Sequence, residues 1–176
     1  YMHCSYADRA DRHDIKRAIN ALIRRKLRDW NLSALPPPKP LETGTKPVMF
    51  VVLEWFNASH SIYRTHSRTM EAARKRFRVV GIGAKNVDAV GRDVFDIFFE
   101  LPEQGGIQAQ LQFISDLARR ESAHVLYMPS VGMYPLTMFL ANLRVAPLQT
   151  YALGHPATTY SPEMDYVVVE EDYVGD

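Results

Sequence analysis

From Pro47 onward, short apolar runs alternate with helical segments. The first run, residues 48–53, is apolar throughout, which is typical of a strand covered on both faces. The pattern predicts strands over 48–53, 79–82, 95–99, 125–128, 148–152 and 166–169, and helices over 61–77, 107–120 and 135–143, with a weak helical turn over 86–92. Strands separated by helices connect by crossovers, so we expect an α/β fold with a doubly wound, mostly parallel, Rossmann-like sheet.

A helical segment and a proline-rich linker precede this alternation. Apolar residues over 13–30 recur at the three- and four-residue spacing of an amphipathic helix. That helix must end before residues 36–40, where four prolines remove amide donors and force an extended chain. We therefore expect a helical segment (1–34), a linker (35–46) and an α/β domain (47–176). The helix either closes an upstream helical region or straps against the domain that follows.

Charge and composition exclude several classes of function. The 176 residues carry a formal net charge of +1, which gives no electrostatic case for a nucleic-acid partner. Basic residues cluster over 9–28 and 74–78, but each stretch also has an apolar helical face, so both are interpreted as solvated helix faces. The one cysteine, Cys4, excludes an internal disulfide and a cysteine-built zinc site.

The same composition indicates the compartment. No apolar run approaches the ~20 residues needed to span a bilayer, and the chain opens with polar residues instead of a leader. We expect a cytoplasmic protein with no membrane partner. Because the chain opens on Tyr1 and stops just after a predicted strand, we also expect it to be a piece of a longer protein.

Three loops of unusual composition directly follow predicted strands. They cover residues 55–60, 129–134 and 154–159, and they contain histidine, glycine and hydroxyl side chains. In an open parallel sheet, ligands bind in the crevice outside the carboxyl ends of the strands. The three loops are therefore expected to form one site.

In the first loop, His60 is expected at the amino end of the next helix. An imidazole there can exchange a proton or hold a sugar hydroxyl or a phosphate oxygen; the alternative is that it only caps the helix. Glu54 could act as a general base or pair with an arginine. His66 lies six residues from His60, which is not a face-sharing spacing, so no metal site is expected. His124 precedes the fourth strand, at the opposite edge of the sheet, and is expected to be structural.

The other two loops add glycines. Gly132 allows either a close backbone approach to a ligand or a tight turn. Gly81 and Gly83 form a lone G-x-G without a third glycine, so no dinucleotide fingerprint is present. In the last loop, glycine and proline flank His155 and are expected to stiffen the turn that presents its imidazole, with two threonine hydroxyls following; a rigid surface turn is the alternative.

The residues around the last loop resemble a known family. Segments 143–149 (LRVAPLQ), 151–158 (YALGHPAT) and 164–168 (MDYVV) follow the order and spacing of a signature of the O-GlcNAc-transferase clan of glycosyltransferases, family 41. Segment 52–61 resembles the clan's first strand and histidine loop, and its amino-acid sequence is most similar to that of the bacterial HMW1C-like N-glycosyltransferases. The resemblance covers about residues 46–172. No tetratricopeptide pattern is present, which argues against the eukaryotic O-linked branch.

The resemblance implies a GT-B architecture, in which two Rossmann-like domains face each other across a cleft. This chain would be the first, acceptor-side half, preceded by the end of a helical N-terminal domain and lacking its C-terminal, nucleotide-binding half. The implied reaction moves glucose or galactose from a UDP-sugar to the asparagine of Asn-x-Ser/Thr sequons in adhesin-type proteins, without a metal or other cofactor. Alone, the chain is expected to be inactive.

The resemblance also implies roles for particular residues. His60 matches a histidine near the donor sugar and the acceptor, and His155 matches a residue of the loop lining the cleft; both are catalytic candidates. The neighbouring candidates for substrate binding are Glu54, Asn57, Ser130, Gly154, Pro156 and Thr158. Two alternatives stay open: an O-linked protein glycosyltransferase, and a non-catalytic Rossmann-like interaction domain.

Overall fold

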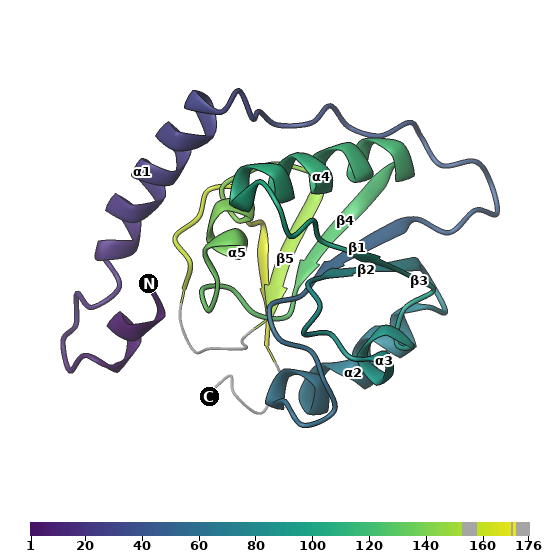
Figure 1. Cartoon of the computed structure of the whole chain (residues 1–176), viewed down its shortest axis with the longest axis horizontal. Helices are drawn as coiled ribbons and strands as arrows, with labels where there is room; N and C mark the ends of the chain where they lie inside the picture. The colour runs from purple at the N-terminus through teal and green to yellow at the C-terminus, as the bar shows by residue number, and fades with distance from the viewer. Residues whose placement is uncertain (153–157, 170, 172–176) are drawn as a thin grey trace.

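Six parallel strands form the sheet that the sequence predicts (Figure 1). The computed structural model describes residues 1–152, 158–169 and 171. The strand order is β3-β2-β1-β4-β5-β6, with bounds β1 (Val48–Val52), β2 (Arg78–Gly83), β3 (Ile97–Glu100), β4 (Ala123–Met128), β5 (Leu148–Ala152) and β6 (Tyr166–Val168). The chain order reverses between β1 and β4, and this switch point is where open α/β sheets hold their ligands.

Helices cover both faces of the sheet, which confirms the doubly wound class. Their bounds are η1 (Met2–Tyr6), α1 (Ile15–Asp29), α2 (Ser61–Ala73), α3 (Ala89–Arg92), α4 (Gly106–Glu121) and α5 (Pro135–Leu140). Helices α2 and α3 lie on one face, whereas α1, α4 and α5 lie on the other (Figure 1). None of the helices in the described part of the chain is long and apolar enough to cross a bilayer.

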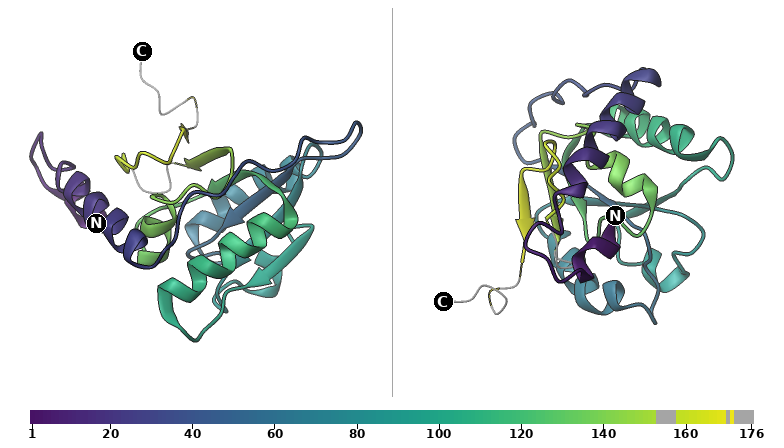
Figure 2. Two further views of the ribbon diagram at one scale, coloured as in Figure 1. Left: turned by 90° about the horizontal axis from the view of Figure 1, so that it is seen from above. Right: turned by 90° about the vertical axis from the view of Figure 1, so that its left-hand side faces the viewer.

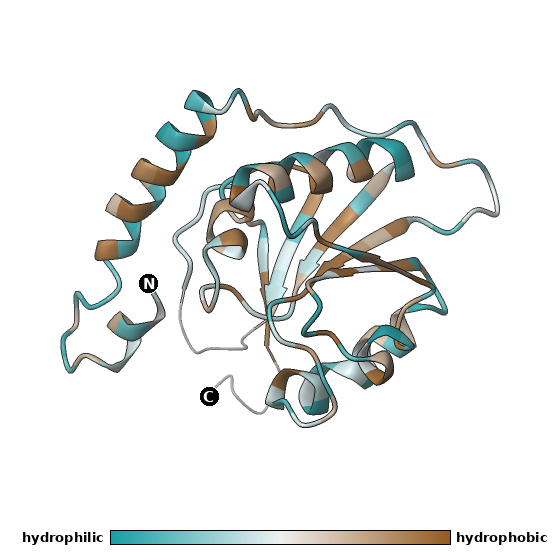
Figure 3. Cartoon of the chain, viewed as in Figure 1, coloured by the Kyte–Doolittle hydropathy of each residue, from teal (hydrophilic) through white to brown (hydrophobic). Residues whose placement is uncertain are grey.

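Alternate side chains of β1 enter two separate apolar cores. Phe50 and Val52 pack with the residues of α4 and α5, while Val51 packs on the opposite face with Ile62 and Met70 of α2. This follows from the two-residue period of a strand. Because both faces are covered, β1 is apolar throughout, and most of its ribbon is brown in Figure 3.

The third strand begins two residues later than the sequence predicts. Phe95 lies before β3 and packs its ring against β2, where a Cβ on Gly81 would overlap that ring. Asp96 also lies before the strand, and its carboxylate accepts a hydrogen bond from the Val79 amide (2.8 Å). The lone G-x-G therefore makes room for an aromatic side chain.

Helix α1 straps against the α/β domain. Its apolar face places Ile23 and Leu27 in the core beside α5. The linker then runs from the end of α1 to β1 (Figure 2), and the Leu35 amide donates to the carbonyl of Arg144 on the way (2.8 Å).

Polar side chains of the same strap hold the segment before β6. Lys16 Nζ donates to the Thr158 carbonyl (2.9 Å), and Asn20 Nδ2 donates to the Thr159 carbonyl (2.9 Å). The Tyr1 hydroxyl also donates to the Thr159 carbonyl (2.8 Å). Burial lowers the pKa of the Lys16 ammonium, since desolvation penalises its charged form.

Candidate functional site

Glu54 ties together the two loops that meet at the switch point. Its carboxylate is 3% exposed and accepts hydrogen bonds from the Ser130 hydroxyl (2.7 Å), the Tyr134 amide (2.8 Å), the Gly132 amide (3.1 Å) and the Thr137 hydroxyl. Of the two alternatives for Glu54, the pairing with an arginine is wrong, because hydroxyls and backbone amides surround the carboxylate instead. Charge-assisted hydrogen bonds of this kind are strong, so Glu54 fixes the loop after β4 against the end of β1.

His60 stands at the amino end of α2, where the sequence places it. It is the N-cap residue, and its Nδ1 accepts a hydrogen bond from the Ile62 amide (3.3 Å). This contact provides a partner for one of the first backbone amides of α2, which have no carbonyl partner within the helix. Because Nδ1 acts as an acceptor, the neutral ring carries its proton on Nε2. The hydrogen bonds of the described residues leave that Nε2–H available to a ligand.

Asn57 shapes the turn that precedes His60. Its side-chain oxygen accepts a hydrogen bond from the Ser59 hydroxyl (2.7 Å), and its carbonyl accepts one from the His60 amide (2.9 Å). These contacts stabilise the turn locally. Asn57 therefore positions His60, while Ser130 is buried in contact with Glu54.

A row of aromatic rings, Tyr134–Trp55–His60, lies along this edge of the sheet. The Trp55 and His60 ring centroids are 6.1 Å apart with an angle of 23° between their planes, and those of Trp55 and Tyr134 are 5.8 Å apart at 24°. Trp55 is 38% exposed and Tyr134 is 36% exposed. The sequence analysis missed both aromatic residues, although each lies within a candidate loop.

A cavity of about 460 Å³ begins beside this row. Tyr134 and Glu54 line it, together with residues that follow β2 and β3 and residues of α4 and α5. Most of the wall is apolar, and includes Leu53, Leu101, Pro102, Ile107, Pro135 and Leu136. Lys85 and Glu103 also line the cavity and form an exposed ion pair (2.7 Å). Its volume is in the range of ligand pockets.

The remaining candidates belong to the last loop. Gly154, His155 and Pro156 lie outside the described residues. Thr158 is exposed; its carbonyl accepts from Lys16, and its hydroxyl accepts from the Tyr160 amide (3.2 Å). The structure thus brings Glu54, Asn57, His60 and Ser130 to one edge, and it holds Thr158 against α1.

The other histidines have structural contacts. His66 is buried, and its Nδ1 lies 3.4 Å from the Tyr127 hydroxyl. His124 lies at the start of β4, where its Nδ1 accepts from the Val48 amide (3.3 Å); it is structural, as expected. Within the described ranges, no three potential ligands gather in a way that could hold a metal ion.

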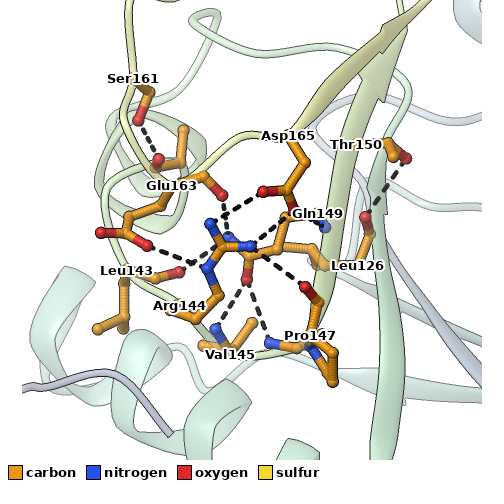
Figure 4. A network of polar contacts seen from close by, with 12 residues as sticks. Leu126, Leu143, Arg144, Val145, Pro147, Gln149, Thr150, Ser161, Glu163 and Asp165 are labelled. Atoms are coloured by element: carbon orange, nitrogen blue, oxygen red, sulfur yellow. Dashed lines mark hydrogen bonds and ion pairs between the residues drawn. The ribbon is translucent and has the colours of Figure 1, made fainter. Parts of the chain in front are cut away.

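The residues that carry the family resemblance form a polar network beside β5 (Figure 4). Gln149 is fully buried; its side-chain oxygen accepts from the amides of Val145 (2.7 Å) and Ala146 (3.2 Å), and its amide nitrogen donates to the carbonyls of Leu143 (3.2 Å) and Glu163 (2.8 Å). The network joins the start of β5 to the segment that leads into β6. This part of the signature therefore has a structural role.

Arg144 completes the network. Its guanidinium pairs with Asp165 through two contacts (2.6 and 3.1 Å) and with Glu163 through a third (3.0 Å). The Arg144 hydrogen bonds lower the pKa of the Asp165 carboxyl. Since planar guanidinium and carboxylate groups match in geometry, this pairing is specific to arginine.

The strand order and the crevice at its switch point define a Rossmann-like domain. Among solved structures, a mutant of the Thermobaculum terrenum O-GlcNAc transferase has a similar fold, with a TM-score of 0.58 and 19% sequence identity. The similarity covers 86% of this chain and 30% of that one.

Two relatives found by sequence have a higher identity to this chain than that structure has. The chain is 46% identical to the UDP-glucose:protein N-β-glucosyltransferases of Actinobacillus pleuropneumoniae serotype 5b (strain L20) and serotype 7 (strain AP76), over 99% of its own length. The family model "HMW1 domain 2" matches residues 1–27. The chain spans 28% of the length of these two relatives. The chain is homologous to part of these two N-β-glucosyltransferases, and the resemblance seen in the sequence is confirmed.

Proposed function

We propose that this chain is the acceptor-side part of a protein N-glycosyltransferase. The enzyme transfers a hexose from UDP-glucose or UDP-galactose to the asparagine of Asn-x-Ser/Thr sequons in adhesin-type proteins, in the cytoplasm and without a metal or other cofactor. The observation that carries the proposal is the 46% identity, over almost the whole chain, to N-β-glucosyltransferases. The nucleotide-binding half lies in the part of the relatives that this chain does not span.

The reaction sets the demands on the site. A bond forms between the amide nitrogen and the anomeric carbon, the bond from that carbon to the diphosphate oxygen breaks, and UDP leaves with the electron pair while the nitrogen releases a proton. Positive charge develops at the anomeric carbon and negative charge at the diphosphate. Because an amide nitrogen is a poor nucleophile, positioning contributes much of the rate.

The described residues meet the positioning demand. His60 Nε2–H donates a hydrogen bond to an oxygen of the acceptor amide or of the sugar, since Nδ1 is occupied by the α2 cap. Glu54 and Asn57 hold the two loops that present it. The aromatic row lies along the same edge of the sheet, beside His60.

The test is transfer by the full-length protein that contains this chain. It is incubated with UDP-glucose and a peptide carrying one Asn-x-Thr sequon, and mass spectrometry locates the added hexose. A matched peptide with Gln-x-Thr is the control. We expect one hexose on asparagine and none on the control. Hexose on the threonine would show O-linked transfer, and no modification of either peptide would favour a non-catalytic interaction domain.

A further inference from the structure

The aromatic row forms a partly exposed surface beside His60. Trp55 and Tyr134 keep more than a third of their surface open to solvent at the switch point, although both are large aromatic residues. Their backbones are held firmly, because Trp55 follows the clamped Glu54 and the Tyr134 amide donates to that carboxylate. Exposed aromatic rings on a fixed backbone bind ligands at a small cost in conformational entropy.

The row leads directly into the 460 Å³ cavity. Tyr134 belongs to both, so the surface runs from His60 across Trp55 and Tyr134 into an apolar hollow. The two centroid separations of 6.1 and 5.8 Å place Tyr134 no more than about 12 Å from His60. An extended polypeptide covers about 3.3–3.6 Å per residue, so three or four residues span that distance.

The charges of the cavity favour a peptide over a nucleotide. A diphosphate requires cations or helix-end amides aimed at its oxygens. The wall contains two carboxylates, Glu54 and Glu103, and one ammonium, Lys85, which is already paired with Glu103. The amino ends of α4 and α5 also reach the wall, but the Tyr134 amide at the start of α5 already donates to Glu54, and Pro135 has no amide hydrogen. An uncharged apolar side chain matches this lining, and burying it excludes water from the wall.

We propose that Trp55, Tyr134 and the cavity form a subsite for the acceptor polypeptide. The acceptor runs in extended form along the aromatic row with its asparagine at His60, and the cavity takes an apolar side chain three or four residues away. This inference rests on the proposed N-glycosyltransferase function and adds a sequence preference outside the sequon.

Peptide scanning with the full-length protein tests the spacing. Two sets of Asn-x-Thr peptides carry either leucine or aspartate at one position, stepped from two to six residues before the asparagine and from three to six residues after it. We expect kcat/KM to favour leucine over aspartate at least fivefold at a position three or four residues away on one side. Equal kcat/KM values for the leucine and aspartate peptides at every position would overturn the proposed subsite while leaving the glycosyltransferase function intact. If no sequon peptide is modified, the proposed function itself fails.

Variants test which residues form the subsite. We expect Trp55→Ala to raise KM for the leucine peptide at least fivefold, with a smaller effect on kcat and none on KM for UDP-glucose, and Trp55→Phe to restore most of the affinity. Ala84→Phe, which fills the cavity from its wall, should remove the leucine preference. Leu22→Ala, at an exposed apolar residue of α1, is the matched control and should behave as wild type. Wild-type KM and preference in both Trp55→Ala and Ala84→Phe would overturn the assignment.

Discussion

The imidazole of His60 caps α2, and we propose that it also contacts the substrate; these two roles can be separated by substitution. Asparagine is a good N-cap residue but has no imidazole, whereas alanine lacks both properties. We expect His60→Asn and His60→Ala each to lower the transfer rate at least tenfold. Only His60→Ala should also lower the free energy of unfolding, by about 1 kcal/mol.

Initial rates with a sequon peptide and urea denaturation of the same preparations measure the two effects. Transfer at the wild-type rate by His60→Asn would mean that the histidine is needed only as a cap.

For single residues, the sequence predicted where a side chain lies in the fold better than it predicted which groups that side chain contacts. His60 was placed correctly because a helix start follows a strand exit, and that signal is local. The partners of Glu54 carried no such signal, since they lie 76 to 83 residues further along the chain and two of them are backbone amides. Trp55 and Tyr134 were missed for a related reason: a ring contact between two loops is visible only after both loops are folded.

At the scale of elements, the network around Arg144 and Gln149 joins β5 to the segment before β6. Asp165 accepts from Arg144 and from the Gln149 amide (2.8 Å), and the Arg144 hydrogen bonds lower its pKa below the ordinary value of 3.8. The stabilisation of the fold by the Asp165 carboxylate is therefore complete above pH 3.8, and it is lost as the pH falls through the lowered pKa of the folded state.

Replacing Asp165 with asparagine tests this pH dependence. At pH 7, Asp165→Asn should be less stable than the wild type by about 1 kcal/mol, because it loses charge-assisted hydrogen bonds. The difference in the free energy of unfolding should narrow as the pH falls below 3.8, since the carboxyl then binds a proton in the unfolded wild-type chain before it does so in the folded one. Thermal unfolding of both proteins between pH 7 and pH 3 provides the measurement. A constant difference over this range would contradict the assignment of the titration to Asp165.

Element boundaries followed the apolar pattern except where an apolar residue packs from outside regular structure. Helix α2 ends at Ala73, although the apolar pattern predicted a helix to residue 77; Phe77 still packs against the core on that face. Phe95 likewise fills space beside Gly81 without belonging to β3. Burial alone therefore predicts which residues point inward, but not where hydrogen-bonded structure stops.

At the scale of the whole molecule, the sheet ends in an exposed strand. All three residues of β6 are exposed, and in the described part of the chain β6 pairs only with β5. An open apolar edge of this kind favours association with another chain. The parallel, doubly wound class followed from the sequence, because strands that alternate with helices are joined by crossovers, whereas the strand order comes from the structure.

We therefore expect the isolated 176-residue chain to transfer no sugar and to self-associate. The reason is that the proposed nucleotide-binding half lies outside it and β6 is left open. The transfer assay and size-exclusion chromatography at several concentrations check both statements, with the full-length protein as the control. Turnover by the isolated chain would contradict the proposed division of the active site.

Tyr1 and helix α1 hold the segment before β6 through its main chain. Lys16, Asn20 and Tyr1 donate hydrogen bonds to main-chain carbonyls, which every amino acid possesses. These hydrogen bonds therefore do not depend directly on which side chains the held segment carries. Substitutions at Thr158, whose side chain is exposed, can therefore change the surface of this segment while its hydrogen bond from Lys16 stays in place.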